Sequence, residues 1–198
     1  MKKILFIVVY VMTVKMSLSQ VIHDTIVLGQ DYVNQSFYRL SDGVESIVNK
    51  QSYELVFDVS NQFSTSINLN SSSFAKLWLY PHGGVSEWPN VDTNGISSWL
   101  NLVDRPENWS LGAFDLTDSS NNLDVGWGIY NTTTHIVTGD SLYVIRIANG
   151  DFKKLQIIDL SNNSYNFRFA NLDGSNEENV SINKANFTGN FAYYSLSD

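Results

Sequence analysis

The stretch from Leu142 to Phe169 constrains the fold of this chain more than any other, because apolar and polar residues alternate along it. Every second residue of 143–147 is Tyr or Ile, which places these side chains on one face of an extended strand. Asn149-Gly150 follows, and both residues tolerate the positive φ angles of a type I′ turn. A second apolar run covers 152–158, and aromatic residues alternate through 165–169. We predict an antiparallel meander of three strands.

Short apolar runs separated by turns rich in Asn, Ser and Gly make up most of the remaining chain. This spacing is typical of an all-β fold, so we predict a single antiparallel β-sandwich or barrel-like domain. The segment 81–123 holds all the prolines and predicts one long irregular loop region, with a short helix at Ser97–Val103. Further strands are predicted at Thr25–Leu28, Ser36–Leu40, Glu45–Asn49, Tyr53–Val59, Ser64–Leu69, Lys76–Tyr80, Val125–Tyr130, Ile136–Val137, Val180–Asn183 and Asn190–Ser195.

Residues 1–19 predict a signal peptide rather than a part of the fold. Lys2-Lys3 precedes an unbroken apolar run from Ile4 to Val11, and Ser17-Leu18-Ser19 supplies small residues at the −3 and −1 positions. The apolar run is too short to span a bilayer. We therefore expect cleavage after Ser19 and a single domain over 20–198. That domain would be secreted, or held in the periplasm or cell envelope, with no transmembrane segment.

Composition excludes several classes of partner and chemistry. Residues 1–19 hold three lysines and no acid, so their removal leaves 9 basic against 20 acidic residues and changes the net charge from −8 to −11. Such an acidic chain argues against binding to nucleic acid or to anionic membranes. The chain has no Cys, which excludes disulfides, thiolate nucleophiles, Cys-bound metals and a lipoprotein cysteine. All three methionines also lie within residues 1–19.

The meander carries a resemblance to a known family. Tyr143-Val144-Ile145-Arg146, followed by Ala148-Asn149-Gly150 and Lys154-Leu155-Gln156-Ile157, is similar to the signature hairpin of the HmuY-like haem-binding proteins. These are secreted or surface haemophores of Gram-negative bacteria, and many are lipoproteins. Weaker similarity extends over Thr25 to Ala170. The resemblance implies a non-enzymatic protein that captures haem for iron acquisition and passes it to an outer-membrane haem receptor.

The resemblance also directs attention to ligands for haem iron. Members of the family use paired His or paired Met, and the expected cleavage removes every Met. His135 lies in the loop before the meander, where the family has one ligand, and His82 is the other candidate. Tyr80 and Tyr130 are alternatives, because a tyrosinate can bind haem iron. His23 is expected in a mobile N-terminal tail.

The tryptophans admit more than one interpretation. Trp78 and Trp127 lie within strand patterns, which favours the core. Trp88, Trp99 and Trp109 belong to the long loop region, where they could line an apolar slot for haem. They could equally form a stacking platform for sugar rings, or pack the loop onto the sandwich. The sugar-binding interpretation makes a glycan- or surface-binding β-sandwich module the main alternative function, beside a structural envelope protein that has lost its ligand site.

Catalytic motifs are absent from the sequence. It contains no Gly-x-Ser-x-Gly, His-Glu-x-x-His, phosphate-loop or dinucleotide-binding pattern, so we do not expect an enzyme. The run Asp118–Asp124 has oxygen donors at alternate positions, as a calcium loop does. It lacks the Gly at the sixth position and the acid at the twelfth that such a loop requires.

Overall fold

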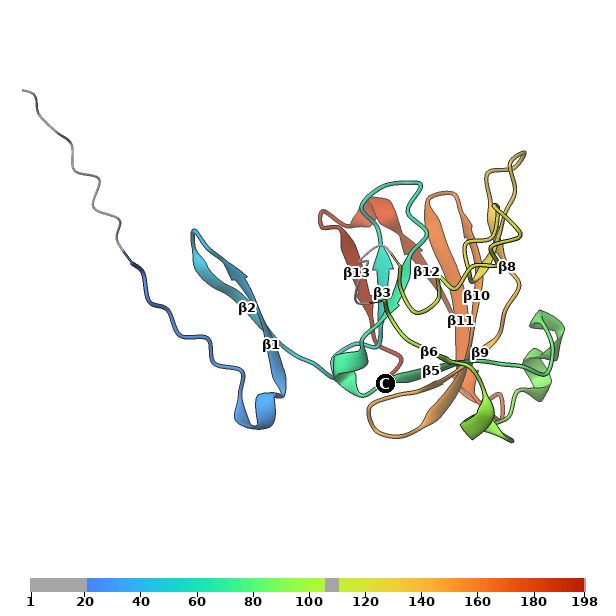
Figure 1. Ribbon diagram of the computed structural model, residues 1–198, viewed down its shortest axis with the longest axis horizontal. Helices are drawn as coiled ribbons and strands as arrows, with labels where there is room; N and C mark the ends of the chain where they lie inside the picture. Colours follow the sequence, from blue (N-terminus) through green and yellow to red (C-terminus); the bar gives the residue numbers. More distant parts are fainter. Residues whose placement is uncertain (1–20, 106–110, 198) are drawn as a thin grey trace, which may run out of the picture.

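The computed structural model describes residues 21–105 and 111–197, so the predicted signal peptide and Trp109 lie outside the described residues. Within these ranges the chain forms strands and a few short 3-10 helices, and every strand pair is antiparallel (Figure 1). The predicted all-β fold class is confirmed. The helices of the described ranges are all too short to cross a membrane. The elements are β1 (Asn34–Arg39), β2 (Gly43–Asn49), β3 (Leu55–Asp58), β4 (Ile67–Leu69), β5 (Lys76–Leu79), β6 (Asn101–Leu102), β7 (Gly128–Tyr130), β8 (Val137–Gly139), β9 (Tyr143–Arg146), β10 (Phe152–Ser161), β11 (Ser164–Asn171), β12 (Glu178–Asn183) and β13 (Phe191–Tyr194), with 3-10 helices η1 (Gln30–Tyr32), η2 (Ser71–Ser73), η3 (Val85–Asn90), η4 (Ile96–Ser98) and η5 (Lys184–Asn186).

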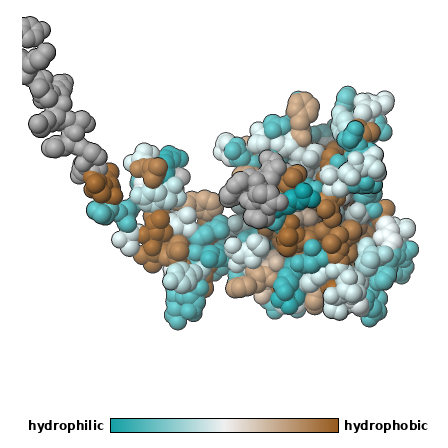
Figure 2. Space-filling view, in the orientation of Figure 1, coloured by the Kyte–Doolittle hydropathy of each residue, from teal (hydrophilic) through white to brown (hydrophobic). Residues whose placement is uncertain are grey.

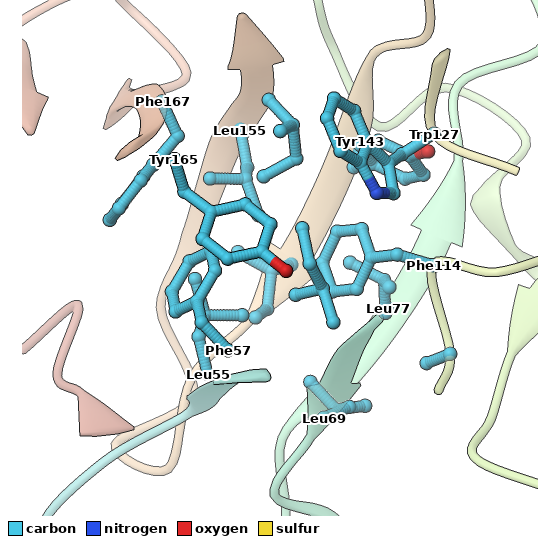
Figure 3. Packing of buried hydrophobic residues seen from close by; sticks show 14 of the residues in the cluster. Leu55, Phe57, Leu69, Leu77, Phe114, Trp127, Tyr143, Leu155, Tyr165 and Phe167 are labelled. Atoms are coloured by element: carbon cyan, nitrogen blue, oxygen red, sulfur yellow. The ribbon is translucent and has the colours of Figure 1, made fainter. Parts of the chain in front are cut away.

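Two sheets pack face to face around the main core. The larger sheet has the order β12-β11-β10-β9-β5-β6, with β7 and β8 attached beside β10, and the smaller sheet has the order β13-β3-β4. Phe57 of β3 reaches across to β11, where its ring centre lies 5.1 Å from those of both Tyr165 and Phe167 (Figure 3). These three side chains are fully buried. The arrangement is an antiparallel β-sandwich.

The predicted meander is present as β9, β10 and β11. Tyr143, Ile145 and Ile147 all face the main core, as do the aromatic residues of 165–169. Val144 points the other way and joins a second cluster on the outer face of the sheet. The alternation in the sequence therefore predicted the two faces of these strands correctly.

The turn between β9 and β10 differs from the predicted type I′ turn. Gly150 has a φ of 98°, but Asn149 is not among the described residues with positive φ, whereas a type I′ turn needs both. Gly150 N–H donates to Ile147 O at 2.9 Å, and Ile147 N–H donates to Asp151 O, so the loop is one residue longer. Asn149 instead uses its side chain, which accepts from Asp151 N–H at 2.9 Å.

Strand β10 is shared by two branches of the larger sheet. Along one edge it pairs with β11; along the other, its first part pairs with β9 and its last part with β8. The register shifts between Ile157 and Asp159, which marks a bulge. Gly139 of β8 passes directly over this point, because a Cβ there would lie only 1.8 Å from Ile157 O.

The long loop folds onto the outer face of the larger sheet. There η3 and η4 bury Trp88 and Trp99 against Val144 and the neighbouring residues of the second cluster. The predicted helix at Ser97–Val103 is wrong, since the segment contains only the end of η4 followed by β6. Strand β6 forms instead because the edge of β5 offers backbone partners for 101–102.

The first hairpin, β1 with β2, forms a two-stranded sheet of its own and stands beside the sandwich (Figure 1). Figure 2 shows apolar surface on this part of the molecule. Leu40, in the turn of the hairpin, and Ile47 of β2 are 92% and 50% exposed. Gln35 of β1 donates to the Tyr53 hydroxyl at 2.8 Å, which links the hairpin to the start of β3. The strand predicted at Thr25–Leu28 is absent, because this segment has no pairing partner.

Candidate functional site

A pocket of about 740 Å³ is formed by residues of the β3–β4 loop, the segment before β7, β7, β8 and the β10–β11 turn. Apolar side chains from different segments form its walls, including Val125, Val137 and Leu160. No formally charged side chain is among the described residues that line it. The lining consists of Gln62, Phe63, Thr65, Asn122, Leu123, Val125, Tyr130, His135, Val137, Leu160, Ser161, Asn162 and Asn163.

Tyr130 and His135, both candidate haem ligands, lie together at this pocket. The Tyr130 hydroxyl is 2.6 Å from His135 Nδ1, and the two ring centres are 6.1 Å apart. The loop between them is held tightly: Asn131 O accepts from His135 N–H at 2.8 Å, and His135 has a φ of 58°. Because the tyrosine occupies Nδ1, a metal would bind His135 through Nε2.

Tyr80 and His82 lie together as well, but outside the pocket. Their ring centres are 5.4 Å apart, and each packs edge-on against Trp99 at 5.5 to 5.6 Å. The Tyr80 hydroxyl donates to Asn90 O, and burial raises the pKa of Tyr80. The structure therefore pairs His135 with Tyr130 and places His82 in a separate aromatic cluster on the long loop.

The two described tryptophans of the long loop, Trp88 and Trp99, are buried rather than exposed at the surface. Trp88 is 6% exposed, with the Arg168 guanidinium 4.2 Å and Lys154 Nζ 4.9 Å from its ring centre. Its indole N–H donates to Glu177 at 3.0 Å. Trp99 is also buried. Of the interpretations left open by the sequence, packing of the loop onto the sandwich describes these two residues, and neither offers a free ring to a sugar.

The other two tryptophans divide between core and outer face. Trp127 is fully buried in the main core, as predicted, and its indole N–H donates to Thr65 O at 2.9 Å. Trp78 is only partly buried and packs on the outer face of the larger sheet, with its ring 6.1 Å from that of Phe152.

Sequence reasoning missed Phe63, which is 80% exposed and lines the pocket from the β3–β4 loop. Its signal was an isolated aromatic residue within the polar turn 60–66. The amide side chains of Asn122, Asn162 and Asn163 were missed too, because Asn-rich turns are common in the chain. These residues come from segments far apart in the sequence.

A second pocket of about 570 Å³ adjoins the first and is acidic. Asp115 lies in it almost fully buried, and burial raises the pKa of its carboxyl to about 7. Hydrogen bonds from Ser66 at 2.5 Å and Gly112 N–H at 2.6 Å oppose that shift. Asp115 thus fastens the segment after 111 to the loop before β4.

The calcium-like run Asp118–Asp124 is used for backbone bonding. Asp124 accepts from the N–H groups of Asp118 and Gly126, and Asp118 accepts from Ser120 N–H. Across the described ranges, no three His, Cys, Asp or Glu side chains are grouped so as to hold a metal ion. The carboxylates of this run therefore act as turn-forming groups.

Comparisons of the chain with models of known families, with curated proteins and with solved structures found no match.

Proposed function

We propose that this protein is a non-enzymatic haem-binding protein that holds haem in the pocket lined by Tyr130 and His135. The observation that carries the proposal is the hydrogen-bonded Tyr–His pair at the edge of an apolar pocket. A volume of about 740 Å³ lies within the usual range for sites that enclose a small molecule or cofactor. Both side chains are established donors to haem iron.

The pair offers two ways to hold the iron. His135 can bind through Nε2 while Nδ1 remains bonded to the Tyr130 hydroxyl, a partner that fixes the orientation of the ring. Alternatively, Tyr130 can bind as a tyrosinate while His135 takes up its proton. Apolar walls would cover the porphyrin, and the neutral amides of the lining could donate hydrogen bonds to its carboxylates.

The resemblance of the 142–157 stretch to HmuY-like proteins and the predicted signal peptide support a role outside the cytoplasm. On this proposal the protein captures haem after export and passes it to an outer-membrane receptor. Lys154 and Gln156 from the resembling stretch have a structural part in this chain: Lys154 donates to Trp88 O and Gln156 accepts from Arg168.

Titration of the purified protein with haemin, followed by absorbance, tests the proposal. We expect a saturable, sharp Soret band, with affinity strongly reduced in both His135→Ala and Tyr130→Phe. His82→Ala serves as the matched control and should bind as the wild type does, since His82 is outside the pocket. A spectrum identical to that of free haemin at every ratio would refute haem binding. Unchanged binding in the His135→Ala/Tyr130→Phe double variant would refute the site.

Glycan binding at the same pocket is the second candidate. The observation that favours it is the combination of an uncharged amide lining with the exposed ring of Phe63, since sugars bind to such surfaces through hydrogen bonds and stacking. Saturable quenching of tryptophan fluorescence by oligosaccharides, without a response to haemin, would select this function.

A further inference from the structure

Phe63 is exposed at a place where an apolar side chain gains nothing from the fold. It is 80% exposed, yet it borders both the pocket of Tyr130 and His135 and the acidic pocket beside it. Burial of a phenyl ring is worth about 1.5–3 kcal/mol to a protein, and this ring leaves that gain unused. An exposed aromatic ring beside a cavity is suited to contact a ligand.

The loop that carries Phe63 is held by a buried lysine from the far end of the chain. Lys184, in η5, is only 4% exposed. Its ammonium group donates hydrogen bonds to three backbone carbonyls of the loop. Nζ donates to Asn61 O at 3.1 Å, to Gln62 O at 3.4 Å and to Ser64 O at 2.5 Å.

Tyr165 of β11 also binds this loop, through hydrogen bonds of its hydroxyl to backbone carbonyls. Its hydroxyl lies 2.9 Å from Ser64 O and 3.0 Å from Asp58 O, and its ring centre is 4.9 Å from Lys184 Nζ. Burial lowers the pKa of Lys184 to about 8, while the nearby Asp58 opposes the shift. Among the described residues no carboxylate forms a salt bridge with Lys184, so its desolvation is offset by backbone carbonyls, by the ring of Tyr165 and by the more distant charge of Asp58.

We propose that Phe63 contacts the ligand of the pocket and that Lys184 and Tyr165 are positioning residues that fix its loop before the ligand arrives. This rests on the proposed function, because the flat face of a porphyrin is the surface on which the ring would stack. Ordering a loop during binding costs affinity, and a loop already fixed avoids that cost. Stacking of one aromatic ring changes affinity by about tenfold.

Haemin titration of Phe63→Ala tests the contact. Phe74→Ala is the matched control, since Phe74 is 66% exposed but does not line the pocket. We expect about tenfold weaker binding for Phe63→Ala with an unchanged Soret position, because the iron ligands remain. Equal affinities for the two variants, with the wild type binding haemin, would overturn the contact alone. Failure of the wild type to bind would overturn the proposed function and, with it, the contact of Phe63 with haem.

The positioning role is tested with Lys184→Met and Lys184→Arg. Asp58 and Tyr165 are the titratable groups that face Lys184, and the raised pKa of Tyr165 keeps its hydroxyl neutral. We expect haemin dissociation from the wild type to accelerate between pH 7 and 9, as Lys184 loses its proton. The Met variant should dissociate about tenfold faster throughout, and the Arg variant should stay slow, since a guanidinium still donates to carbonyls at pH 9.

Hydrogen exchange of the loop amides gives a readout that needs no ligand. Phe63 N–H donates to the Asn61 side chain and Ser64 N–H to Asn61 O, so both are protected while the loop is fixed. We expect faster exchange at these amides in Lys184→Met, and protection restored in Lys184→Arg. Wild-type exchange in Lys184→Met would overturn the positioning role, whatever the outcome with haemin.

Discussion

Gly139 provides the sharpest test of how the larger sheet is assembled. A Cβ at this position would lie 1.8 Å from Ile157 O, and real Cβ contacts are essentially never below 3.0 Å. In Gly139→Ala, β8 must therefore move away from β10 by about 1.2 Å or more. That shift exceeds what a backbone hydrogen bond tolerates. The pairs that join 137–138 to 159–160 would be lost.

The cost of this substitution follows from the contacts that the shift removes. About two backbone hydrogen bonds at about 1 kcal/mol each, together with part of the burial of Val137, give a loss of about 2–4 kcal/mol. Gly189→Ala is the matched control, because nothing lies within 4 Å of a Cβ there and the backbone is not in the left-handed region. That variant should remain within about 0.5 kcal/mol of the wild type.

Urea denaturation followed by tryptophan fluorescence measures both variants. Trp127 is a suitable reporter, since it is fully buried in the main core and directly precedes β7, the strand that pairs with β8. If Gly139→Ala and Gly189→Ala unfold at the same urea concentration as the wild type, Gly139 does not lie against the backbone of β10 as described. The pocket wall formed by Val137 and Leu160 would then also need a different explanation.

Two further predictions concern pH and the turn of the meander. Burial raises the pKa of Asp115 to about 7, so the folded state binds this proton more tightly than the unfolded state does. The free energy of unfolding should therefore fall as pH rises from about 4 through 7, and it should fall less steeply in Asp115→Asn. The same slope of unfolding free energy against pH in Asp115→Asn and in the wild type would contradict the assignment. The raised pKa of Asp104 contributes in the same direction, so a smaller slope should remain. In the turn, Asn149→Gly should destabilise the protein by about 0.5–1 kcal/mol, because only Gly150 has positive φ, and Gly150→Ala should cost about 1–2 kcal/mol. Stabilisation by Asn149→Gly in thermal unfolding would instead support a type I′ turn.

The parts of the fold that the sequence predicts are those determined by neighbouring residues. Alternation at 143–147 and 165–169 depends only on the period of an extended strand, and the structure places both sets in the core. The helix expected at Ser97–Val103 does not form, because residues 101–102 pair with the edge of β5. That strand is more than 20 residues away in the sequence, so local helix propensity gives no information about the pairing. The prediction of a type I′ turn was wrong because the backbone of Asn149 does not adopt a positive φ. Its side chain accepts a hydrogen bond from Asp151 N–H instead.

The candidate site was predicted only in part for the same reason. His135 and Tyr130 are five residues apart, and a tight loop brings them together. His82 looked equivalent in the sequence, but its surroundings depend on how the long loop packs. Trp88 is covered by Lys154 and Arg168, which lie 66 and 80 residues further along the sequence. Contacts between residues so far apart cannot be predicted from a local sequence pattern.

The branching of the larger sheet at β10 also determines which parts of the molecule can open independently. Among the described residues, the backbone pairing of β7 and β8 with the remainder of the sheet is the short stretch at 159–160, whereas β9 and β11 pair with β10 over longer stretches. Local opening requires the loss of few contacts where pairing is short. We therefore expect the β7–β8 hairpin, with Tyr130 and His135 at its turn, to open at a lower free-energy cost than the β5–β9–β10–β11 part of the sheet, the loss of Val137 burial included. A ligand held by Tyr130 and His135 would then enter and leave at the rate of that opening.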